Sequence, residues 1–257
     1  SRNALHEAAK LVTSFSKVET AKVFRLVREQ KKWVWQTGFE IKCLKGKRIG
    51  SGSFRDCFEI AISDFGRLPN GRYVIKTWND KAAETLQNDF EIPKKHEDVL
   101  QELSRRAVQC QNVACGLATE FKNAVNDKKE FGTFLRAYII EYDNTNCTLE
   151  ERIDGVYTKY INNNMILLNA QSEYGPKCSA LAHFSYNFSE RKLILSDLQG
   201  SEEVLTDPEI ASFYRYDTDN KGSLLYGIGN YGNESLDNFK VEHECSKYCM
   251  LAGLVPL

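Results

Sequence analysis

A long apolar stripe is the feature that most constrains how this chain can fold. Its members alternate in steps of three and four residues: Leu100, Leu103, Ala107, Cys110, Ala114, Leu117 and Phe121. This spacing places their side chains on one face of a single helix. Because such a face must be buried against another element, the sequence predicts that the helix packs on a sheet formed by the strand-like segments before it.

These strand-like segments occupy residues 41–49, 54–62 and 73–78. They are rich in strand-forming residues and are separated by turn-forming ones, so their order predicts an antiparallel meander. A further apolar strand is predicted over residues 134–142. Residues 5–28 instead carry apolar side chains at helical spacing, which predicts one or two helices before the sheet.

The second half of the chain mixes short strands, such as residues 192–198, with short helices and loops. A β-rich first half and a mixed second half predict an α+β chain of two lobes with a cleft between them. We expect a helical extension over residues 1–32, a first lobe with an antiparallel sheet and a packing helix over 33–148, and a mixed second lobe over 149–257.

Composition narrows the class of protein. The 257 residues include 34 Lys and Arg against 35 Asp and Glu, and 42% are hydrophobic. That apolar content can form a folded core, and a net charge of −1 gives no support for nucleic acid or membrane as a partner. No apolar run approaches the roughly 18–20 residues of a membrane span.

The N-terminal segment and the cysteines bear on the cellular compartment. Charges interrupt the N-terminal segment where a signal peptide needs apolar residues. Most of the eight cysteines lie in apolar or helical patterns, as buried free thiols do. We therefore expect a cytoplasmic chain.

The first candidate site is the turn Gly50-Ser51-Gly52-Ser53-Phe54-Arg55, followed by Lys76 on the next predicted strand. Backbone amides of a glycine turn can approach phosphate oxygens, and a lysine behind them supplies a fixed positive charge. The alternative is a plain hairpin turn with a surface lysine. The sequence leaves both interpretations open.

The second candidate is an apolar strand that ends in Asp197-Leu198-Gln199-Gly200, followed by Thr206-Asp207-Pro208. Asp197 and Gln199 alternate correctly to share a strand face, and such oxygen ligands suit Mg²⁺ that bridges phosphates. A carboxylate beside them can orient and deprotonate an attacking hydroxyl. Alternatively, Asp197 only ends the strand, and Thr206 or Asp207 caps a helix before Pro208.

The third candidate, Gly227-x-Gly229-x-x-Gly232, has the spacing of a dinucleotide-binding loop. Too few residues follow it for the strand–helix–strand unit that such a loop requires. We therefore expect a loop that cradles phosphate or shapes the cleft.

The fourth candidate is His243-x-Cys245-x-x-x-Cys249 near the C-terminus. A helix that begins near Cys245 would place both thiols on one face, with His243 just before it, a set that suits tetrahedral Zn²⁺. His183 is the best fourth ligand, although a histidine in an apolar segment is often an ordinary core residue. With all four positions filled by protein, the zinc would be structural.

Together these elements resemble the atypical α-kinase family, which includes myosin heavy-chain kinases, elongation-factor-2 kinase and the channel-kinases. The resemblance covers about residues 40–257, with the family's motifs in the family's order. It implies a two-lobed protein-kinase-like fold and a serine/threonine kinase that transfers the ATP γ-phosphoryl group to protein hydroxyls. The alternatives are a catalytically inactive nucleotide- or phosphopeptide-binding module with a zinc-stabilised core, and a zinc-stabilised interaction domain that binds no nucleotide.

The resemblance also implies roles for individual residues. Lys76 would hold the α- and β-phosphates, Glu150 and Ile153 would lie at the adenine, and Asp197 would be the catalytic base. Gln199 and Asp207 would bind Mg²⁺, and His183, His243, Cys245 and Cys249 would bind the structural zinc. The remaining ATP-site residues would be Gly50, Gly52, Ser53, Arg55, Lys159, Thr206, Gly227, Gly229 and Gly232. Two departures from the family pattern, Leu149 and Ile161, remove no functional side chain.

Two further expectations complete the sequence-based account. The partner is a protein substrate whose identity the sequence does not give, and the N-terminal helix is a candidate for self-association. The triplet Asp64-Phe65-Gly66 has the letters of the metal-binding motif of ordinary protein kinases, but it precedes Lys76 and no catalytic loop accompanies it. We expect an ordinary loop between strands there.

Overall fold

The first part of the chain forms a closed antiparallel barrel. The computed structural model describes residues 18–29, 32–89, 95–125, 132–216 and 224–257. Around the barrel the strands follow the order β1 (Glu19–Phe24), β4 (Phe39–Ser51), β5 (Arg55–Asp64), β6 (Tyr73–Trp78), β9 (Thr145–Glu151) and β8 (Ala137–Tyr142). The predicted meander is confirmed in β4, β5 and β6, and the sheet closes because β1 pairs with both β4 and β8.

The barrel interior explains this closure. Inward-facing side chains such as Val23, Ile41, Ile75, Ile140 and Leu149 are buried and form one apolar cluster. In β1 and the first part of β4 these residues alternate with exposed ones, the pattern of a half-buried strand, whereas β6, β8 and β9 are buried on both faces over most of their length. The hairpin of β2 (Leu26–Glu29) and β3 (Lys32–Trp35) connects β1 to β4.

The expectation of an N-terminal helix is wrong for residues 19–29. Ala21 and Val23 point into the barrel while Thr20 and Lys22 point outward, so a period of two places the apolar side chains better than a helix would. Closure of the sheet stabilises the strand conformation of this segment, because β1 pairs with the otherwise open edges of β4 and β8. The rest of the predicted helix, residues 1–17, lies outside the described residues, as does the proposed self-association.

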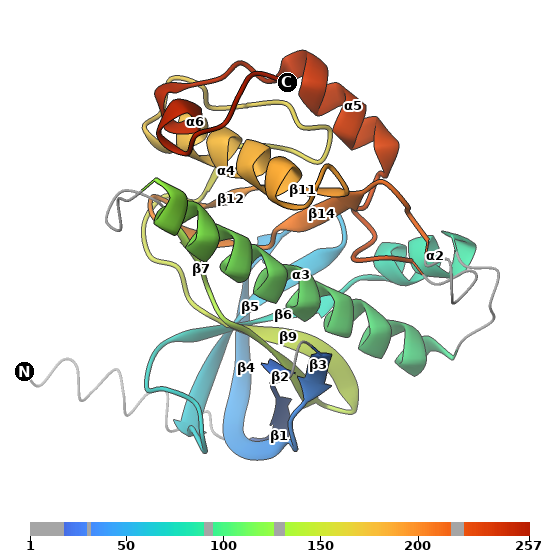
Figure 1. Cartoon of the computed structure of the whole chain (residues 1–257). Helices are drawn as coiled ribbons and strands as arrows, with labels where there is room; N and C mark the ends of the chain where they lie inside the picture. The colour runs from blue at the N-terminus through green and yellow to red at the C-terminus, as the bar shows by residue number, and fades with distance from the viewer. Residues whose placement is uncertain (1–17, 30–31, 90–94, 126–131, 217–223) are drawn as a thin grey trace, which may run out of the picture.

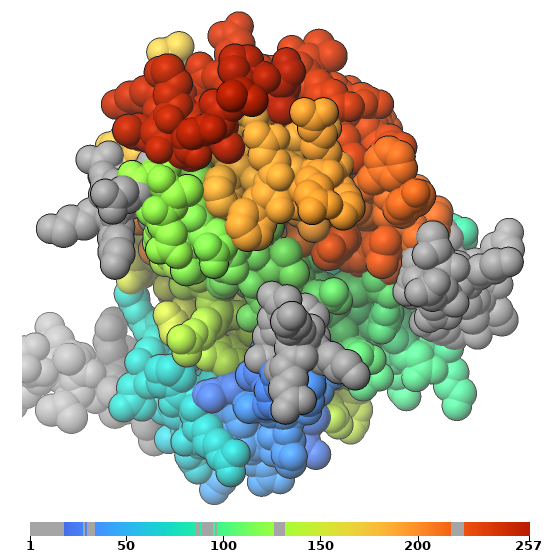
Figure 2. All heavy atoms as spheres, viewed as in Figure 1, coloured from blue at the N-terminus to red at the C-terminus, as the bar shows by residue number. Residues whose placement is uncertain are grey.

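The predicted long helix is confirmed as α3 (His96–Ala124), which crosses the middle of the molecule (Figure 1). In Figure 2 it forms a green band between the blue and cyan barrel and the orange and red C-terminal part. The C-terminal part of the apolar stripe faces the second lobe, where Cys110, Ala114 and Phe121 join a cluster with Ile194 and Leu195. At its N-terminal end, Leu100 and Leu103 form a separate cluster with Ala82, Ala83, Leu224 and Ile228. Contact with the barrel comes instead from neighbouring residues of α3 such as Val108. The helix therefore packs on both lobes and not on the sheet alone.

The second lobe surrounds α4 (Tyr174–Phe188), which is buried along most of its length. A four-stranded sheet joins β10 (Thr158–Lys159), β12 (Gln199–Ser201), β13 (Val204–Thr206) and β7 (Thr133–Phe134), and β11 (Leu193–Ser196) pairs with β14 (Glu209–Ser212). The remaining helices are α2 (Asp80–Asp89), α5 (Asn233–Glu242) and α6 (Lys247–Leu251).

Two details differ from the sequence-based expectation. The strand predicted over residues 134–142 is divided into β7 and β8, which belong to different sheets. The predicted lobe boundary after residue 148 falls inside β9, which stays in the barrel until Glu151. None of the helices in the described ranges is long and apolar enough to cross a membrane.

Candidate active site

A cavity of about 720 Å³ lies between the barrel and the second lobe. It brings together twelve of the residues that the sequence predicted at the ATP and magnesium sites. They are Gly50, Gly52, Ser53, Arg55, Lys76, Glu150, Ile153, Lys159, Asp197, Gln199, Thr206 and Asp207. Gly227, Gly229 and Gly232 are not in this lining, but Ile228 and Tyr231 of the same loop are.

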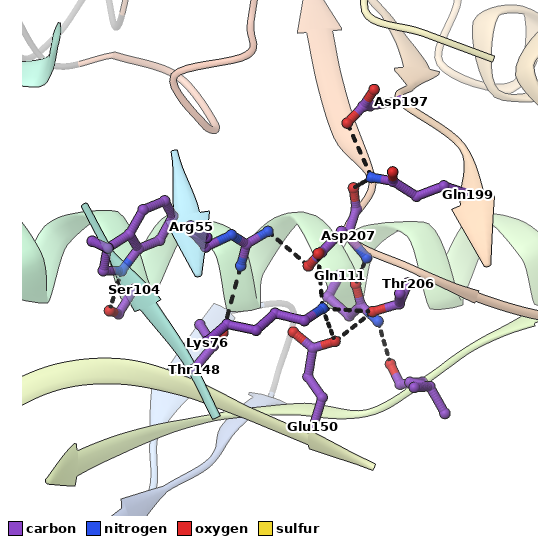
Figure 3. A network of polar contacts seen from close by, with 12 residues as sticks. Arg55, Lys76, Ser104, Gln111, Thr148, Glu150, Asp197, Gln199, Thr206 and Asp207 are labelled. Atoms are coloured by element: carbon purple, nitrogen blue, oxygen red, sulfur yellow. Dashed lines mark hydrogen bonds and ion pairs between the residues drawn. The ribbon is translucent and has the colours of Figure 1, made fainter. Parts of the chain in front are cut away.

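Lys76 is the centre of a buried ion-pair network (Figure 3). Its Nζ lies 2.7 Å from Oε2 of Glu150 and 2.7 Å from Oδ2 of Asp207. The guanidinium of Arg55 contacts the other oxygen of Asp207, also at 2.7 Å, and the hydroxyl of Thr206 donates to Glu150. The alternative of a surface lysine is therefore wrong, because β6 directs Lys76 into the cavity.

The network holds its members in their charged forms. Burial raises the pKa of the Asp207 carboxyl, but Arg55 and Lys76 outweigh this and lower that pKa to about 2. Burial likewise lowers the pKa of Lys76, and the negative charges of Asp207 and Glu150 more than reverse it. At neutral pH the network therefore supplies two buried cations, Lys76 and Arg55, to the cavity, which suits a polyphosphate ligand.

Asp197 lies in the turn between β11 and β12, with a left-handed φ of 53°. Oδ1 lies 2.5 Å from Nζ of Lys159, and Oδ2 accepts a hydrogen bond of 3.0 Å from the amide of Gln199. The two residues do not share one strand face, because β11 ends at Ser196; the tight turn brings them together instead. Burial raises the pKa of the Asp197 carboxyl despite the positive charge of Lys159.

Asp207 also has a left-handed φ, 53°, and connects β13 to β14. The interpretation of Thr206 or Asp207 as a helix cap is therefore wrong, because a strand follows Pro208. The backbone N–H of Asp207 donates to Oε1 of Gln111 at 3.1 Å, and Nε2 of Gln111 donates to the carbonyl of Leu135 at 2.7 Å. Sequence reasoning missed Gln111, although an amide beside the apolar stripe of α3 was a usable signal.

The first glycine turn lies at the mouth of the cavity. It joins β4 to β5, and the N–H of Gly52 donates to the carbonyl of Arg55 at 2.8 Å. Gly50, Gly52 and Ser53 are exposed or half-exposed and line the cavity opposite the second lobe. The turn is therefore a hairpin that is also in a position to contact phosphate, and only the surface lysine of the alternative interpretation is wrong.

Glu209 is a cavity residue that sequence reasoning missed. It begins β14, two residues after Asp207, and burial together with the nearby charge of Asp197 raises the pKa of its carboxyl to about 8. Its side chain lies directly against Gly227 and Gly229. A charged residue at the start of the apolar segment Ile210-Ala211 was the signal that could have identified it.

A second cluster lies away from the cavity and contains the four predicted zinc ligands. One ligand atom from each of His183, His243, Cys245 and Cys249 lies within 4.8 Å of the others. Nε2 of His243 is 3.0 Å from Nδ1 of His183 and 3.6 Å from the sulfur of Cys249. Two imidazoles and two thiols are the donor set of a closed structural zinc site, so the residues fit that metal.

The local geometry of this cluster differs from the expected helix. The helix α6 begins only at Lys247, so Cys245 precedes it and does not share a helix face with Cys249. Burial lowers the pKa of His183, and burial together with His183 lowers that of His243 to about 4. Both rings are therefore neutral at pH 7, the form that binds metal. The hydroxyl of Ser179 lies 2.8 Å from Nδ1 of His243 and orients its ring.

The triplet Asp64-Phe65-Gly66 is the loop that the sequence predicted. Asp64 ends β5 on the exposed surface, where its Oδ1 accepts a hydrogen bond of 3.0 Å from the N–H of Gly66. It does not line the cavity.

Comparison with known proteins agrees with the geometry of the cavity. The sequence model of the Alpha-kinase family matches residues 50–249. Alpha-protein kinase 2 of Danio rerio is 29% identical over 222 residues, which cover 81% of this chain and 11% of that protein. Myosin heavy chain kinase B of Dictyostelium discoideum is 29% identical over 212 residues, which cover 80% of this chain and 25% of that protein. The chain thus spans about a tenth to a quarter of these curated relatives.

Solved structures show the same fold. The alpha-kinase domain of myosin-II heavy chain kinase A in complex with AMP-PNP superimposes with a TM-score of 0.72, covering 95% of this chain and 97% of that domain at 19% identity. The same domain complexed with ADP gives a TM-score of 0.71. Because the family match extends over most of the sequence and the cavity contains the family's motifs, the chain belongs to the Alpha-kinase family of atypical protein kinases.

Proposed function

We propose that this chain transfers the γ-phosphoryl group of ATP to serine or threonine hydroxyls of a protein substrate. The observation that carries the proposal is the meeting of Lys76, Asp197, Gln199 and Asp207 in one cavity, although they come from β6 and from two separate turns of the second lobe. An inactive relative has no need to retain this set. Nucleotide complexes of the structurally similar kinase domain support ATP as the ligand.

The proposed positions follow from charge and geometry. Lys76 and Arg55 present positive charge to the phosphates, and the exposed turn at Gly52 closes over them. Glu150 and Ile153 lie where the barrel strand β9 leaves for the second lobe, the proposed adenine position. The carboxylate of Asp207 forms ion pairs with both Arg55 and Lys76. Bound phosphate would pair with these two cations instead, and the carboxylate oxygens of Asp207 would then be available to bind Mg²⁺.

Gln199 and Asp207 are the residues that would hold Mg²⁺. The amide and carboxylate oxygens are ligands that this ion prefers, and both side chains line the cavity. When bound, magnesium would neutralise phosphate charge. Asp197 is the proposed base: Lys159 and Gln199 fix its orientation, and its raised pKa makes it a better acceptor for the proton of the attacking hydroxyl.

We further propose that His183, His243, Cys245 and Cys249 hold a structural zinc ion, because four protein ligands leave no open position for chemistry. The eight free cysteines and the balanced charge favour a reducing, cytosolic compartment for the chain.

The test is transfer from ATP labelled in the γ-phosphate to three peptides that differ only in a central serine, threonine or tyrosine. We expect magnesium-dependent labelling of the serine and threonine peptides and none of the tyrosine peptide. Labelling of tyrosine alone would overturn the proposed specificity, and binding of ATP with no transfer to any acceptor would favour the inactive nucleotide-binding module.

A further inference from the structure

The glycine loop 224–232 and the side chain of Glu209 are shaped around each other. A Cβ atom placed on Gly229 would lie 2.6 Å from both Cγ and Cδ of Glu209, and one placed on Gly227 would collide with its carboxyl oxygen. Neither glycine has a positive φ, so their backbone conformation is open to other residues. Glycine is required at these two positions because the Glu209 side chain occupies the space that a Cβ atom would need.

The third glycine of the pattern, Gly232, is required for a different reason. Gly232 has a φ of 66° and no atom closer than 3.8 Å to its added Cβ, and it stands just before α5. Its requirement is therefore conformational. The Gly-x-Gly-x-x-Gly spacing thus reflects one carboxyl contact and one turn, not a nucleotide-binding strand–helix unit.

The contact between Glu209 and the loop is close packing, since an added Cβ on Gly229 would also lie 3.0 Å from Oε2 of Glu209. The loop residues Ile228 and Tyr231 line the cavity, and Ile228 belongs to an apolar cluster against which Phe54 of the first glycine turn also packs. The position of the loop therefore sets the wall of the cavity near Asp197 and Asp207, which are close enough to Glu209 to influence its charge.

We infer that Glu209 is a positioning residue for phosphoryl transfer: it holds the loop from Gly227 to Tyr231 against the carboxylate end of the cavity, where the acceptor hydroxyl enters. The inference rests on the proposed kinase function. It assigns the loop to acceptor binding, because the proposed adenine residues Glu150 and Ile153 belong to a different wall.

The test compares steady-state kinetics of wild type, Glu209→Ala and Glu209→Gln, with the acceptor peptide and ATP varied separately. Glu209→Ala should raise KM for the peptide by about three- to tenfold, because the loop loses the side chain that it packs against, with KM for ATP nearly unchanged. Glu209→Gln keeps the volume and an acceptor oxygen, so it should retain most of the wild-type peptide KM. An unchanged peptide KM in Glu209→Ala, or an equal rise for ATP, would overturn the inference.

A double-mutant cycle tests the contact itself. Gly229→Ala should impair peptide binding in wild type but add little in the Glu209→Ala background, where the methyl group has room. Gly116→Ala is the matched control, because an added Cβ there meets nothing within 4 Å, and it should be silent. Equal damage from Gly229→Ala in both backgrounds would contradict the inference. If Glu209→Ala fails to fold, Glu209→Asp, which withdraws the carboxyl by one methylene, takes its place.

Amide hydrogen exchange separates this inference from the proposed function, because it requires no activity. The backbone N–H groups of the loop from Gly227 to Tyr231, Gly229 among them, should exchange at least about tenfold faster in Glu209→Ala than in wild type, because the loop loses the side chain that it packs against, while the N–H of Asp207, bonded to Gln111, keeps its protection. A wild type without kinase activity but with this exchange pattern would refute the kinase proposal and leave the Glu209 contact intact. Equal exchange at Gly229 in both proteins would refute the contact.

Discussion

At the scale of single residues, Lys76 contacts more charged partners in the cavity than its neighbour Arg55 does, because two carboxylates lie against it. Its side chain is 9% exposed and lies between Glu150 and Asp207. In the absence of nucleotide it offsets the charges of two carboxylates, and with nucleotide it is placed to meet phosphate. The same residue therefore supports the fold of the cavity and its proposed chemistry.

This dual role gives a prediction for Lys76→Ala. Phosphoryl transfer should fall on the order of 100-fold or more, because a fixed charge at the phosphates is lost. The free energy of unfolding should also fall, by about 3 kcal/mol, since two carboxylates lose their shared counterion. Turnover measurements and denaturant unfolding check the two effects. Turnover within threefold of wild type would contradict the role of Lys76.

Asp64→Asn provides the matched control at this scale. Asp64 is exposed, and asparagine keeps the oxygen that accepts from Gly66. Stability should change by no more than about 0.5 kcal/mol and activity should be retained. Loss of activity in a stable Asp64→Asn protein would mean that the metal site lies at Asp64-Phe65-Gly66 and not in the cavity.

At the scale of elements, α3 connects the barrel to the second lobe. The C-terminal part of its apolar stripe packs on the second lobe, Val108 packs on the barrel side, and Gln111 reaches the backbone of Asp207. Arg106 of the same helix donates to the carbonyl of Tyr226 at 3.0 Å, next to the glycine loop. Two walls of the cavity are thus fixed to one helix.

Gln111→Ala should therefore alter the position of Asp207 in the cavity, because Gln111 holds the backbone of Asp207. The change leaves the N–H of Asp207 and the carbonyl of Leu135 without their partner, so unfolding free energy should fall by about 2 kcal/mol and the Mg²⁺ concentration for half-maximal activity should rise. Gln101→Ala, on an exposed position of the same helix, is the control and should be nearly silent. Identical magnesium titrations for Gln111→Ala and wild type would show that this hydrogen bond does not position Asp207.

The zinc cluster joins α4 to the C-terminal segment, because His183 lies in α4 and the other three ligands follow α5. Cys249→Ser or prolonged chelation should make this segment sensitive to protease, because metal binding and folding are coupled. Cys115→Ser, at a half-buried thiol outside the cluster, is the control. Purified wild type without stoichiometric zinc, or a Cys249→Ser protein that stays compact, would contradict the structural role.

Protonation gives a second test of the same cluster. The pKa of His243 is lowered to about 4 in the folded metal-free chain, against 6.5 for an unperturbed ring. The unfolded state therefore binds more protons between these values, so the metal-free protein should lose stability as pH falls from about 6.5 toward 4. Thermal unfolding of metal-free protein across this range should show the loss, and a Tm independent of pH there would contradict the lowered pKa.

At the scale of the whole molecule, periodic patterns made the regular elements predictable. The spacing in α3 and the runs of strand-forming residues in β4, β5 and β6, separated by turn-forming ones, are local, so they can be read from the sequence. Closure of the barrel was not predictable in this way, because β1 gains its partners from strands far along the chain. There the tertiary pairing outweighed a helical spacing of apolar residues.

The site was predictable where motifs carried the signal, as for Lys76, Asp197, Gln199 and Asp207. The contacts between motifs were not, because they depend on turns whose geometry is set by the fold. Asp197 and Asp207 have left-handed backbones that no spacing rule indicates. Gln111 and Glu209 act on the cavity from regular elements and belong to no motif, so the sequence carries only weak signals for them, and their contacts in the structure identify them.

If Asp197 is the base for phosphoryl transfer in this cavity, removing its ability to accept a proton should stop the transfer without removing the nucleotide site. The rate of γ-phosphoryl transfer to a serine peptide should be measured for wild type and Asp197→Asn at saturating ATP and Mg²⁺. Asparagine keeps the size and the contact with Gln199 but cannot take a proton, so transfer should fall on the order of 100-fold or more while ATP still raises Tm in both proteins. Equal transfer rates in the two proteins would contradict the account.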